Sequence, residues 1–162
     1  DALGKSRVET DKLPLARDLL RRADQANVEV LLPTDLVVAP GADAQVSERV
    51  PIDKVPADQM ALDIGPDTVA GYRDRLLRAR TIFWNGPMGV FEKEPFARGT
   101  LGIARAIAET GAYTVVGGGD SVAAVHQSGV AVRFSHVSTG GGASLELIEG
   151  RRLPGIEALR PS

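Results

Sequence analysis

The stretch Tyr113-Thr114-Val115-Val116, followed directly by Gly117-Gly118-Gly119-Asp120-Ser121, decides the fold. A β-branched apolar run that breaks into glycines and then Asp-Ser predicts a buried strand, a tight turn and a helix with Asp120 at its N-cap. Each glycine lowers helix or strand stability by roughly 0.5–1 kcal/mol relative to Ala. A ligand-free turn capped by Asp120 explains the carboxylate but not three glycines in a row, so we expect a ligand close to this backbone.

Two further loops repeat the pattern. Asn85-Gly86-Pro87-Met88-Gly89 follows the apolar run Thr81–Trp84, and Gly140-Gly141-Gly142-Ala143-Ser144 follows a run that ends at Ser138. A rigid loop is the alternative for the first and a flexible hinge for the second, and the sequence leaves both open. A helix that begins at Ala143 would direct its first amides at an anion. Three glycine-rich strand ends together predict one shared phosphate site.

Strands and helices alternate along the chain. The expected helices span about 11–26, 66–77, 96–108 and the segment after Ser121, and the expected strands span 28–32, 36–39, 45–50, 61–64, 81–84, 113–116 and the run before Ser138. Strands that are apolar on both faces favour a parallel sheet covered by helices. We therefore expect the α/β class: a single Rossmann-like three-layer αβα domain with a mainly parallel sheet, spanning residues 1–162.

Composition excludes several classes of partner. A net charge of −2 gives no electrostatic reason to expect nucleic acid or an anionic membrane. No stretch approaches the ~20 apolar residues of a membrane span, and the start of the chain is not a signal peptide. The absence of Cys excludes disulfides and thiolate metal sites and fits a cytoplasmic location. A chain whose first residue is Asp1 instead of Met is expected to be processed, cut or incomplete.

Common catalytic motifs are absent. The dinucleotide pattern G-x-G-x-x-G fails after Gly117 and again after Gly140, because Val122 and Leu145 stand at its third glycine. Gly4-Lys5-Ser6 has the ending of a phosphate-binding P-loop but lacks the first glycine and a preceding strand. His126 and His136 lie outside any metalloprotease or hydrolase pattern, so structural roles are expected for both.

Two carboxylates fit a nucleotide site. Asp120 is expected to bind Mg²⁺, because magnesium at such sites keeps most of its waters and needs only one or two carboxylates besides phosphate oxygens. Glu92 lies just past the loop 85–89, where it could accept hydrogen bonds from ribose hydroxyls.

The whole set of loops resembles the phosphoglycerate kinase family. The residues that carry the resemblance are Thr81-Ile82-Phe83-Trp84-Asn85-Gly86-Pro87-Met88-Gly89-Val90-Phe91-Glu92, the loop 117–121, Ser135-His136-Val137-Ser138-Thr139-Gly140-Gly141-Gly142-Ala143-Ser144-Leu145-Glu146 and Leu153-Pro154-Gly155-Ile156. The resemblance runs from about Gly4 to the C-terminus. It implies a glycolytic kinase that transfers a phosphoryl group between 1,3-bisphosphoglycerate and ADP, giving 3-phosphoglycerate and ATP with Mg²⁺.

The resemblance also implies a role for each site residue. Leu62, Pro87 and Val90 would line the adenine pocket, Glu92 would hold the ribose, and Asn85 would lie near the nucleotide phosphates. Gly118, Gly119 and Ser121 would contact phosphate, and Asp120 would bind the metal. Gly141 and Gly142 would donate amides to the transferring phosphoryl group, and Ser138 and Thr139 would belong to an interdomain hinge.

The family's N-terminal domain, with the arginine that holds the acid substrate, and the lysine-bearing start of its nucleotide domain have no counterpart here. No Lys or Arg lies in the three loops. We therefore expect part of a C-terminal nucleotide-binding domain that is inactive alone, from a parent enzyme that is a monomer. A non-catalytic nucleotide-binding module is the alternative, and a third possibility is that a neighbouring chain replaces the missing strands at an exposed sheet edge.

Overall fold

The structure is a computed structural model that describes residues 3–159. Six strands form two separate three-stranded sheets, one of order β2-β1-β3 and one of order β4-β5-β6. The strands are β1 (Asp35–Ala39), β2 (Glu48–Pro51), β3 (Met60–Ile64), β4 (Thr81–Asn85), β5 (Tyr113–Gly117) and β6 (His136–Ser138). The helices are α1 (Leu13–Gln25), α2 (Pro66–Leu76), α3 (Arg98–Ala108), α4 (Gly119–Gln127), α5 (Gly141–Ile148) and α6 (Pro154–Glu157), with short 3₁₀ turns at Thr10–Lys12, Ile52–Lys54, Glu94–Phe96 and Ala131–Arg133.

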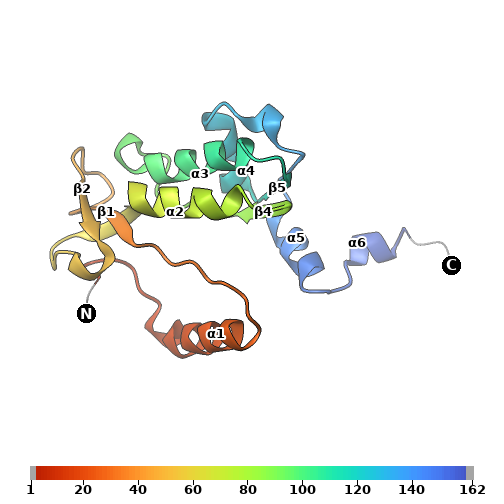
Figure 1. Cartoon of the computed structure of the whole chain (residues 1–162), viewed down its shortest axis with the longest axis horizontal. Coiled ribbons are helices and arrows are strands. Elements are labelled where there is room, and N and C mark those ends of the chain that lie inside the picture. The colour runs from red at the N-terminus through yellow and green to blue at the C-terminus, as the bar shows by residue number, and fades with distance from the viewer. Residues whose placement is uncertain (1–2, 160–162) are drawn as a thin grey trace.

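The fold class is α/β, as predicted, and the sheet β4-β5-β6 is parallel with helices flanking it. The helix-strand alternation did not predict that the other sheet is antiparallel throughout. Short connections without an α-helix join β1 to β2 and β2 to β3, and only parallel neighbours require a long crossover. These three strands form a small sheet beside α2 (Figure 1).

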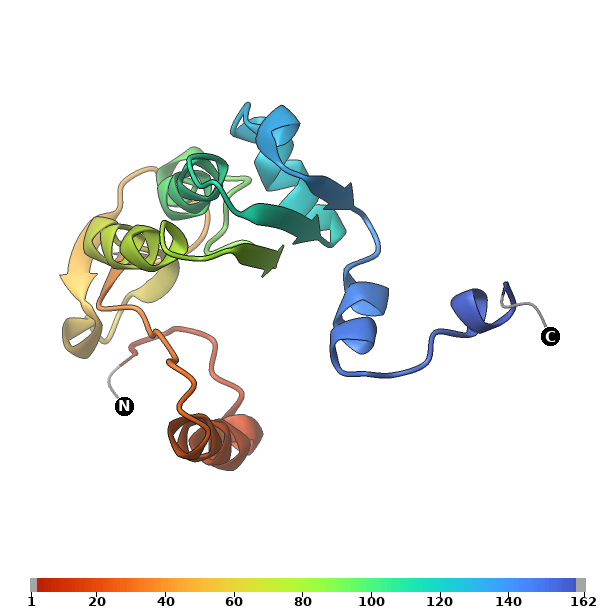
Figure 2. The same cartoon turned by 45° about the vertical axis from the view of Figure 1, so that its right-hand side comes forward.

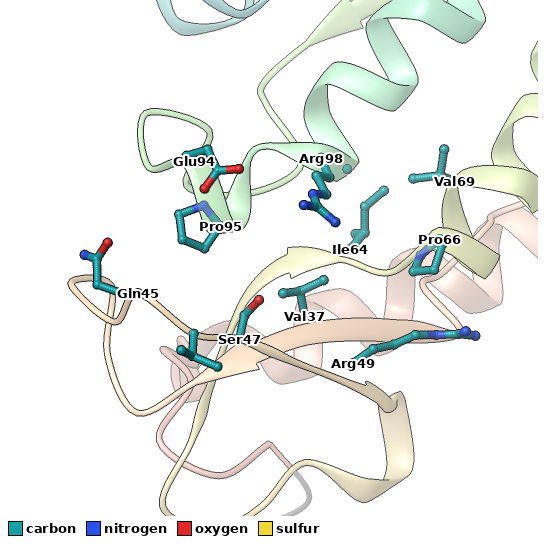
Figure 3. A pocket seen from close by; sticks show the side chains of 12 residues that line it. Val37, Gln45, Ser47, Arg49, Ile64, Pro66, Val69, Glu94, Pro95 and Arg98 are labelled. Atoms are coloured by element: carbon teal, nitrogen blue, oxygen red, sulfur yellow. The ribbon is translucent and has the colours of Figure 1, made fainter.

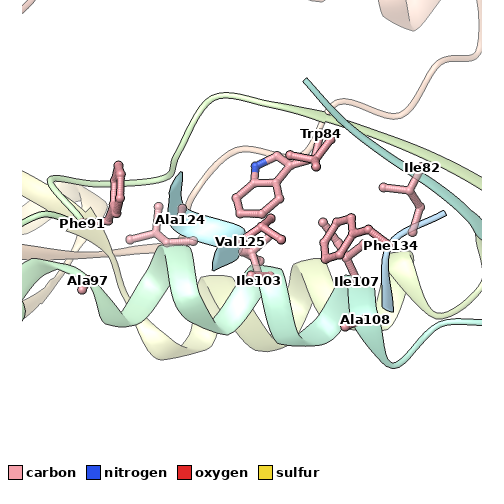
Figure 4. Packing of buried hydrophobic residues seen from close by; sticks show 13 residues of the cluster. Ile82, Trp84, Phe91, Ala97, Ile103, Ile107, Ala108, Ala124, Val125 and Phe134 are labelled. Carbon is pink, nitrogen blue, oxygen red and sulfur yellow. The ribbon is translucent and has the colours of Figure 1, made fainter. Parts of the chain in front are cut away.

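The main core lies where β4 and β5 meet α3 and α4 (Figure 4). Trp84 and Phe134 stack with ring centroids 6.5 Å apart. Alanines on α3 and α4, among them the fully buried Ala104 and Ala124, let the helices pack closely. The residues that β4 and β5 turn to the opposite face, Phe83 and Val115, are only half-buried.

The strand expected at 28–32 is wrong. Residues 28–32 are extended but join no sheet, and Val28, Val30 and Leu32 stay exposed. Contacts to the middle of the segment come from α2, where the Tyr72 hydroxyl donates to the Leu31 carbonyl (3.1 Å) and Arg75 forms an ion pair with Glu29 (2.9 Å). A strand needs a neighbour for its backbone hydrogen bonds, and no described strand lies along this one.

Helices α1 and α6 stand apart from the sheets, whereas α5 meets the parallel sheet at its first turn (Figures 1 and 2). Leu13, Leu15, Leu19 and Leu20 on α1 are all exposed. Within residues 3–159, no helix is both long and apolar enough to cross a membrane.

Candidate functional site

The carboxyl ends of the three parallel strands lie side by side. In the strand register Asn85 pairs with Gly117, and Gly117 pairs with Ser138. Each strand ends at or beside one of the three glycine loops, so the loops converge at one sheet edge. The Gly118 N–H donates to the Ser138 carbonyl (3.1 Å) and so joins the loop 117–121 to the end of β6, just before the loop 140–144. The sequence predicted this convergence.

Two of the glycines are required by space or backbone conformation. Gly118 has φ of +91°, a region that residues with a Cβ rarely adopt. Gly141 has no room for a side chain, since a Cβ there would lie 2.5 Å from the Asn85 Oδ1 atom and 2.8 Å from the Gly118 backbone. Asn85, Gly118 and Gly141, one from each loop, therefore form a single contact cluster.

Ser121 fixes the loop 85–89 to the loop 117–121. Its hydroxyl is 1% exposed and accepts the Gly86 N–H at 2.6 Å. Gly86 has φ of +109°, so this bond holds a conformation that favours glycine. The structure thus gives Ser121 a role in positioning the loop.

Asp120 is not the N-cap that the sequence predicted. Helix α4 already begins at Gly119, its N-cap is Gly118, and no side chain caps it. The positive φ of Gly118 turns the chain into the helix early and places Asp120 within the first turn, where the helix dipole favours a carboxylate. Its side chain is exposed, and no hydrogen bond or ion pair to it is found within the described residues.

Helix α5 also begins earlier than expected, at Gly141 instead of Ala143. Gly141 and Gly142 are its first two residues, so their amides belong to the turn that has no partners inside the helix. Gly141 is buried against Asn85 and Gly118, whereas Gly142 is exposed. The positive end of the α5 dipole thus faces the same sheet edge as α4.

Leu62 and Val90 lie together at a second place. The Val90 N–H donates to the Leu62 carbonyl (2.9 Å), and both residues line a cavity of about 530 Å³. Ala42, Met60 and Arg7 also line this cavity and were missed in the sequence, although Met60 directly precedes the predicted strand 61–64. Pro87 and Glu92 do not line it, and Glu92 is exposed.

A buried threonine holds the loop 85–92 in place, and a buried aspartate binds the start of α3 beside it. Thr100, on α3, is fully buried and its hydroxyl accepts the N–H groups of Met88 (3.0 Å) and Gly89 (3.1 Å). Asp63, on β3, is 3% exposed and accepts the N–H groups of Ile64 (2.9 Å) and Gly99 (2.6 Å). Burial raises the pKa of Asp63 to about 6, although the hydrogen bonds from the two backbone N–H groups oppose this shift. The position of Asp63 inside the apolar strand 61–64 is the sequence signal that could have revealed this buried carboxylate.

The two histidines lie where the sequence placed them, His126 in α4 and His136 in β6, and both are exposed. Within the described residues, no group of three or more His, Asp or Glu side chains is arranged to hold a metal ion. A nucleotide-bound Mg²⁺ does not need such a group, because water and phosphate oxygens supply most of its ligands.

Comparisons with known proteins point to one family. The family model described as "Phosphoglycerate kinase" matches residues 1–151. The chain is 55% identical over 159 residues to a phosphoglycerate kinase of Pelotomaculum thermopropionicum, covering 98% of this chain and 40% of that protein. The phosphoglycerate kinase of Moorella thermoacetica is also 55% identical over 159 residues, again with 40% of its length covered.

Solved structures agree with the sequence comparison. A phosphoglycerate kinase from Coxiella burnetii superposes with a TM-score of 0.90 at 41% identity, covering 96% of this chain and 40% of that one. The enzyme from Pyrococcus horikoshii superposes with a TM-score of 0.78 at 34% identity, covering 98% of this chain and 40% of that one.

Proposed function

The chain belongs to the phosphoglycerate kinase family, and on that premise we propose that it carries the Mg-ADP/ATP side of phosphoryl transfer between 1,3-bisphosphoglycerate and ADP. It spans about 40% of the length of the relatives it matches. Residues 1–162 would then be part of the C-terminal nucleotide-binding domain. A separate N-terminal domain of the parent enzyme would hold 3-phosphoglycerate or 1,3-bisphosphoglycerate, and a cytoplasmic location would suit this glycolytic role.

The contact between Asn85, Gly118 and Gly141 carries this proposal. It brings three strand-end loops, two of them leading into helix N-termini, to one edge of a parallel sheet. Unpaired amides and helix dipoles stabilise bound phosphate at such an edge. The nucleotide phosphates would lie over Asn85, Gly118, Gly119 and Ser121. The hydrogen bond from the Gly86 N–H to the Ser121 hydroxyl would hold the loop 85–89 in place beneath them.

The adenine ring would lie in the 530 Å³ cavity at Leu62 and Val90. Its volume is within the range of small-molecule pockets, and its lining includes several apolar side chains. Pro87 lies outside the lining of this cavity and would contact the nucleotide from the adjoining loop. Glu92 would accept the ribose hydroxyls from the rim, where its exposed carboxylate is accessible.

The residues present fit Mg²⁺. The Asp120 carboxylate is exposed, has no hydrogen-bond or ion-pair partner within the described residues, and lies in the first turn of α4 beside the phosphate loop. One such oxygen ligand is sufficient when phosphates and water complete the shell. When bound, the metal would neutralise negative charge on the phosphate oxygens.

The chain's own contribution to the chemistry would be positioning and charge stabilisation. Phosphoryl transfer needs little covalent help from the protein. The Gly141 and Gly142 amides, at the positive end of α5, would donate to the oxygens of the phosphoryl group while it moves. A cationic clamp is missing, since no Lys or Arg lies in the three loops, and single arginine fingers are worth about 10³–10⁵ in rate. The chain alone should therefore be inactive.

Calorimetric titration of the 162-residue chain with Mg-ADP tests the proposal. We expect weak binding, with a Kd on the order of 1 mM, because only part of the site is present. Asp120→Asn should remove the dependence of ADP affinity on Mg²⁺ while leaving metal-free affinity unchanged. Tight binding would favour the non-catalytic module instead. Measurable formation of ATP from ADP and 1,3-bisphosphoglycerate by the pure chain would refute the proposed inactivity.

A further inference from the structure

A separate cavity lies between the antiparallel sheet and the first turns of α2 and α3 (Figure 3). Its volume is about 610 Å³, which is within the range of small-molecule sites. None of the residues proposed to bind the nucleotide lines it. The lining residues are Val37, Gln45, Val46, Ser47, Arg49, Ile64, Pro66, Val69, Glu94, Pro95, Arg98 and Gly99.

The walls of this cavity are mostly apolar. Val37 and Ile64 come from the sheet, Val69 comes from α2, and Pro66 and Pro95 contribute ring faces from the starts of two helices. In Figure 3 these side chains surround a central space. An occupant with a compact apolar body would gain the free energy of removing these surfaces from water.

Arg98 brings an unpaired positive charge into this space. Figure 3 shows its guanidinium pointing between the walls toward Ile64 and Val37. Within residues 3–159, it has no hydrogen-bond or ion-pair partner. As the first residue of α3 it also adds to the positive end of the helix dipole.

The other charged lining groups do not neutralise Arg98. Arg49 is already paired, with its Nε atom donating to Asp35 (2.7 Å) and another nitrogen to Asp67. Glu94 lines the cavity, but no ion pair joins it to Arg98 in the described part of the chain. The cavity thus combines apolar walls with the guanidinium of Arg98 and the carboxylate of Glu94, neither of which has an ion-pair partner within the described residues.

We propose that this cavity binds a small organic carboxylate with an apolar body. A guanidinium presents paired N–H donors that match a carboxylate in a bidentate arrangement. The apolar walls would cover the body of the ligand. The site is separate from the proposed nucleotide site, because the two share no lining residue.

Benzoate is the probe for this proposal, titrated into the ¹⁵N-labelled 162-residue chain and followed by amide chemical shifts. We expect saturable shifts at Gly99, Val69 and Ser47. Arg98→Gln should weaken binding about tenfold, equivalent to the loss of about 1.4 kcal/mol. Val46→Asp, which places a carboxylate on an exposed lining position, should weaken it as well.

Matched controls separate this site from general binding. Arg80→Gln removes an exposed arginine outside the cavity and should leave the affinity unchanged. Benzyl alcohol lacks the charge and inorganic phosphate lacks the apolar body, so both should bind at least about tenfold more weakly than benzoate. Equal binding of either probe, or equal affinity of the Arg98→Gln chain for benzoate, would overturn the proposal. An Arg98→Gln spectrum that otherwise matches the parent's would confirm that the fold is intact.

Discussion

Gly141 and Gly142 are adjacent in the sequence, but only one of them has room for a side chain. A Cβ on Gly141 would lie 2.5 Å from Asn85 Oδ1, whereas Gly142 has no heavy atom within 4 Å of the same position. The two residues therefore form a matched pair for testing how closely the loops pack.

We expect Gly141→Ala to lower the free energy of unfolding by about 2 kcal/mol, because the two neighbouring loops must move apart. Gly142→Ala should leave stability unchanged or raise it by about 0.5–1 kcal/mol, since alanine favours the helix. Urea unfolding followed by circular dichroism measures both. Equal effects of the two substitutions would contradict the contact between the loops.

Thr100 holds two consecutive amides of the loop 85–92 with one hydroxyl. Thr100→Val keeps the shape but leaves the Met88 and Gly89 amides without their acceptor, and we expect it to cost about 2 kcal/mol. Thr100→Ser keeps the hydroxyl and should cost about 1 kcal/mol for the lost methyl group. Chemical unfolding of the three chains in parallel is the measurement. A Ser variant less stable than the Val variant would show that packing, not hydrogen bonding, is the role of Thr100.

Asp63 should make stability depend on pH. Its folded pKa of about 6 lies above the ordinary value of 3.8, so between these pH values the folded chain holds a proton that the unfolded chain releases. Its contribution is fully present below about pH 4 and decreases by about 3 kcal/mol as pH rises through 6. Asp63→Asn should remove this slope. Unfolding free energies of both chains from pH 4 to 7 provide the test, and parallel curves would exclude the assignment.

At the scale of single elements, a buried carboxylate on strand β1 holds the start of helix α2. Asp35 on β1 accepts the Thr68 N–H (2.7 Å), the Thr68 hydroxyl (2.6 Å) and the Asp67 N–H (3.1 Å) at the start of α2. Burial tends to raise the pKa of Asp35, but these bonds, together with Arg49, outweigh burial and lower it below 3.8.

Asp35→Asn should therefore destabilise the chain by about 2–3 kcal/mol at pH 7, because charged acceptors make the stronger bonds. Because the pKa of Asp35 is lowered in the folded chain, its carboxylate contributes stability above its ordinary pKa. This contribution is lost as pH falls through the folded pKa. The stability difference between the two chains should therefore shrink below about pH 4. Asp67→Asn, at the exposed partner of Arg49, should change stability by less than about 1 kcal/mol. Melting temperatures at pH 7 and pH 3 measure all three chains. A difference that stays constant with pH would contradict this role.

The sequence predicted the elements whose signals are local. Apolar spacing alone predicted the helices α1, α2 and α3, and glycines marked the ends of β4 and β5. Neither signal depends on which other element lies alongside. Residues 28–32 have the same β-branched pattern but form no strand, since that outcome depends on a neighbour the pattern does not contain. The support from Asp63 and Thr100 was missed for a similar reason, because each bonds to backbone amides distant in the sequence.

The early starts of α4 and α5 show a second limit of prediction. The sequence placed both helices after their glycines, because glycine disfavours helix interiors. The structure begins α4 at Gly119 and α5 at Gly141, since contacts among the three loops fix these backbones. The three loops were thus correctly predicted to converge at the strand ends, whereas both helices begin two residues earlier than expected.

At the scale of the whole molecule, two apolar features are left uncovered. The segment 28–32 carries exposed valines and leucines, and β4 is an edge strand that pairs only with β5 among the described strands. Phe83 on β4 is only half-buried. An unpaired edge next to apolar surface is a template for strand addition by another chain.

We therefore expect the pure chain to associate with itself, with segment 28–32 of one copy lying along β4 of another. Multi-angle light scattering should show the average mass rising above 17.1 kDa as protein concentration increases. Val30→Glu places a charge in the associating segment and should shift the equilibrium toward monomer. Val132→Glu, at a valine that is 94% exposed elsewhere, is the control and should behave like the parent. A strict monomer at all concentrations would rule out strand exchange, and equal effects of the two substitutions would place the contact outside segment 28–32.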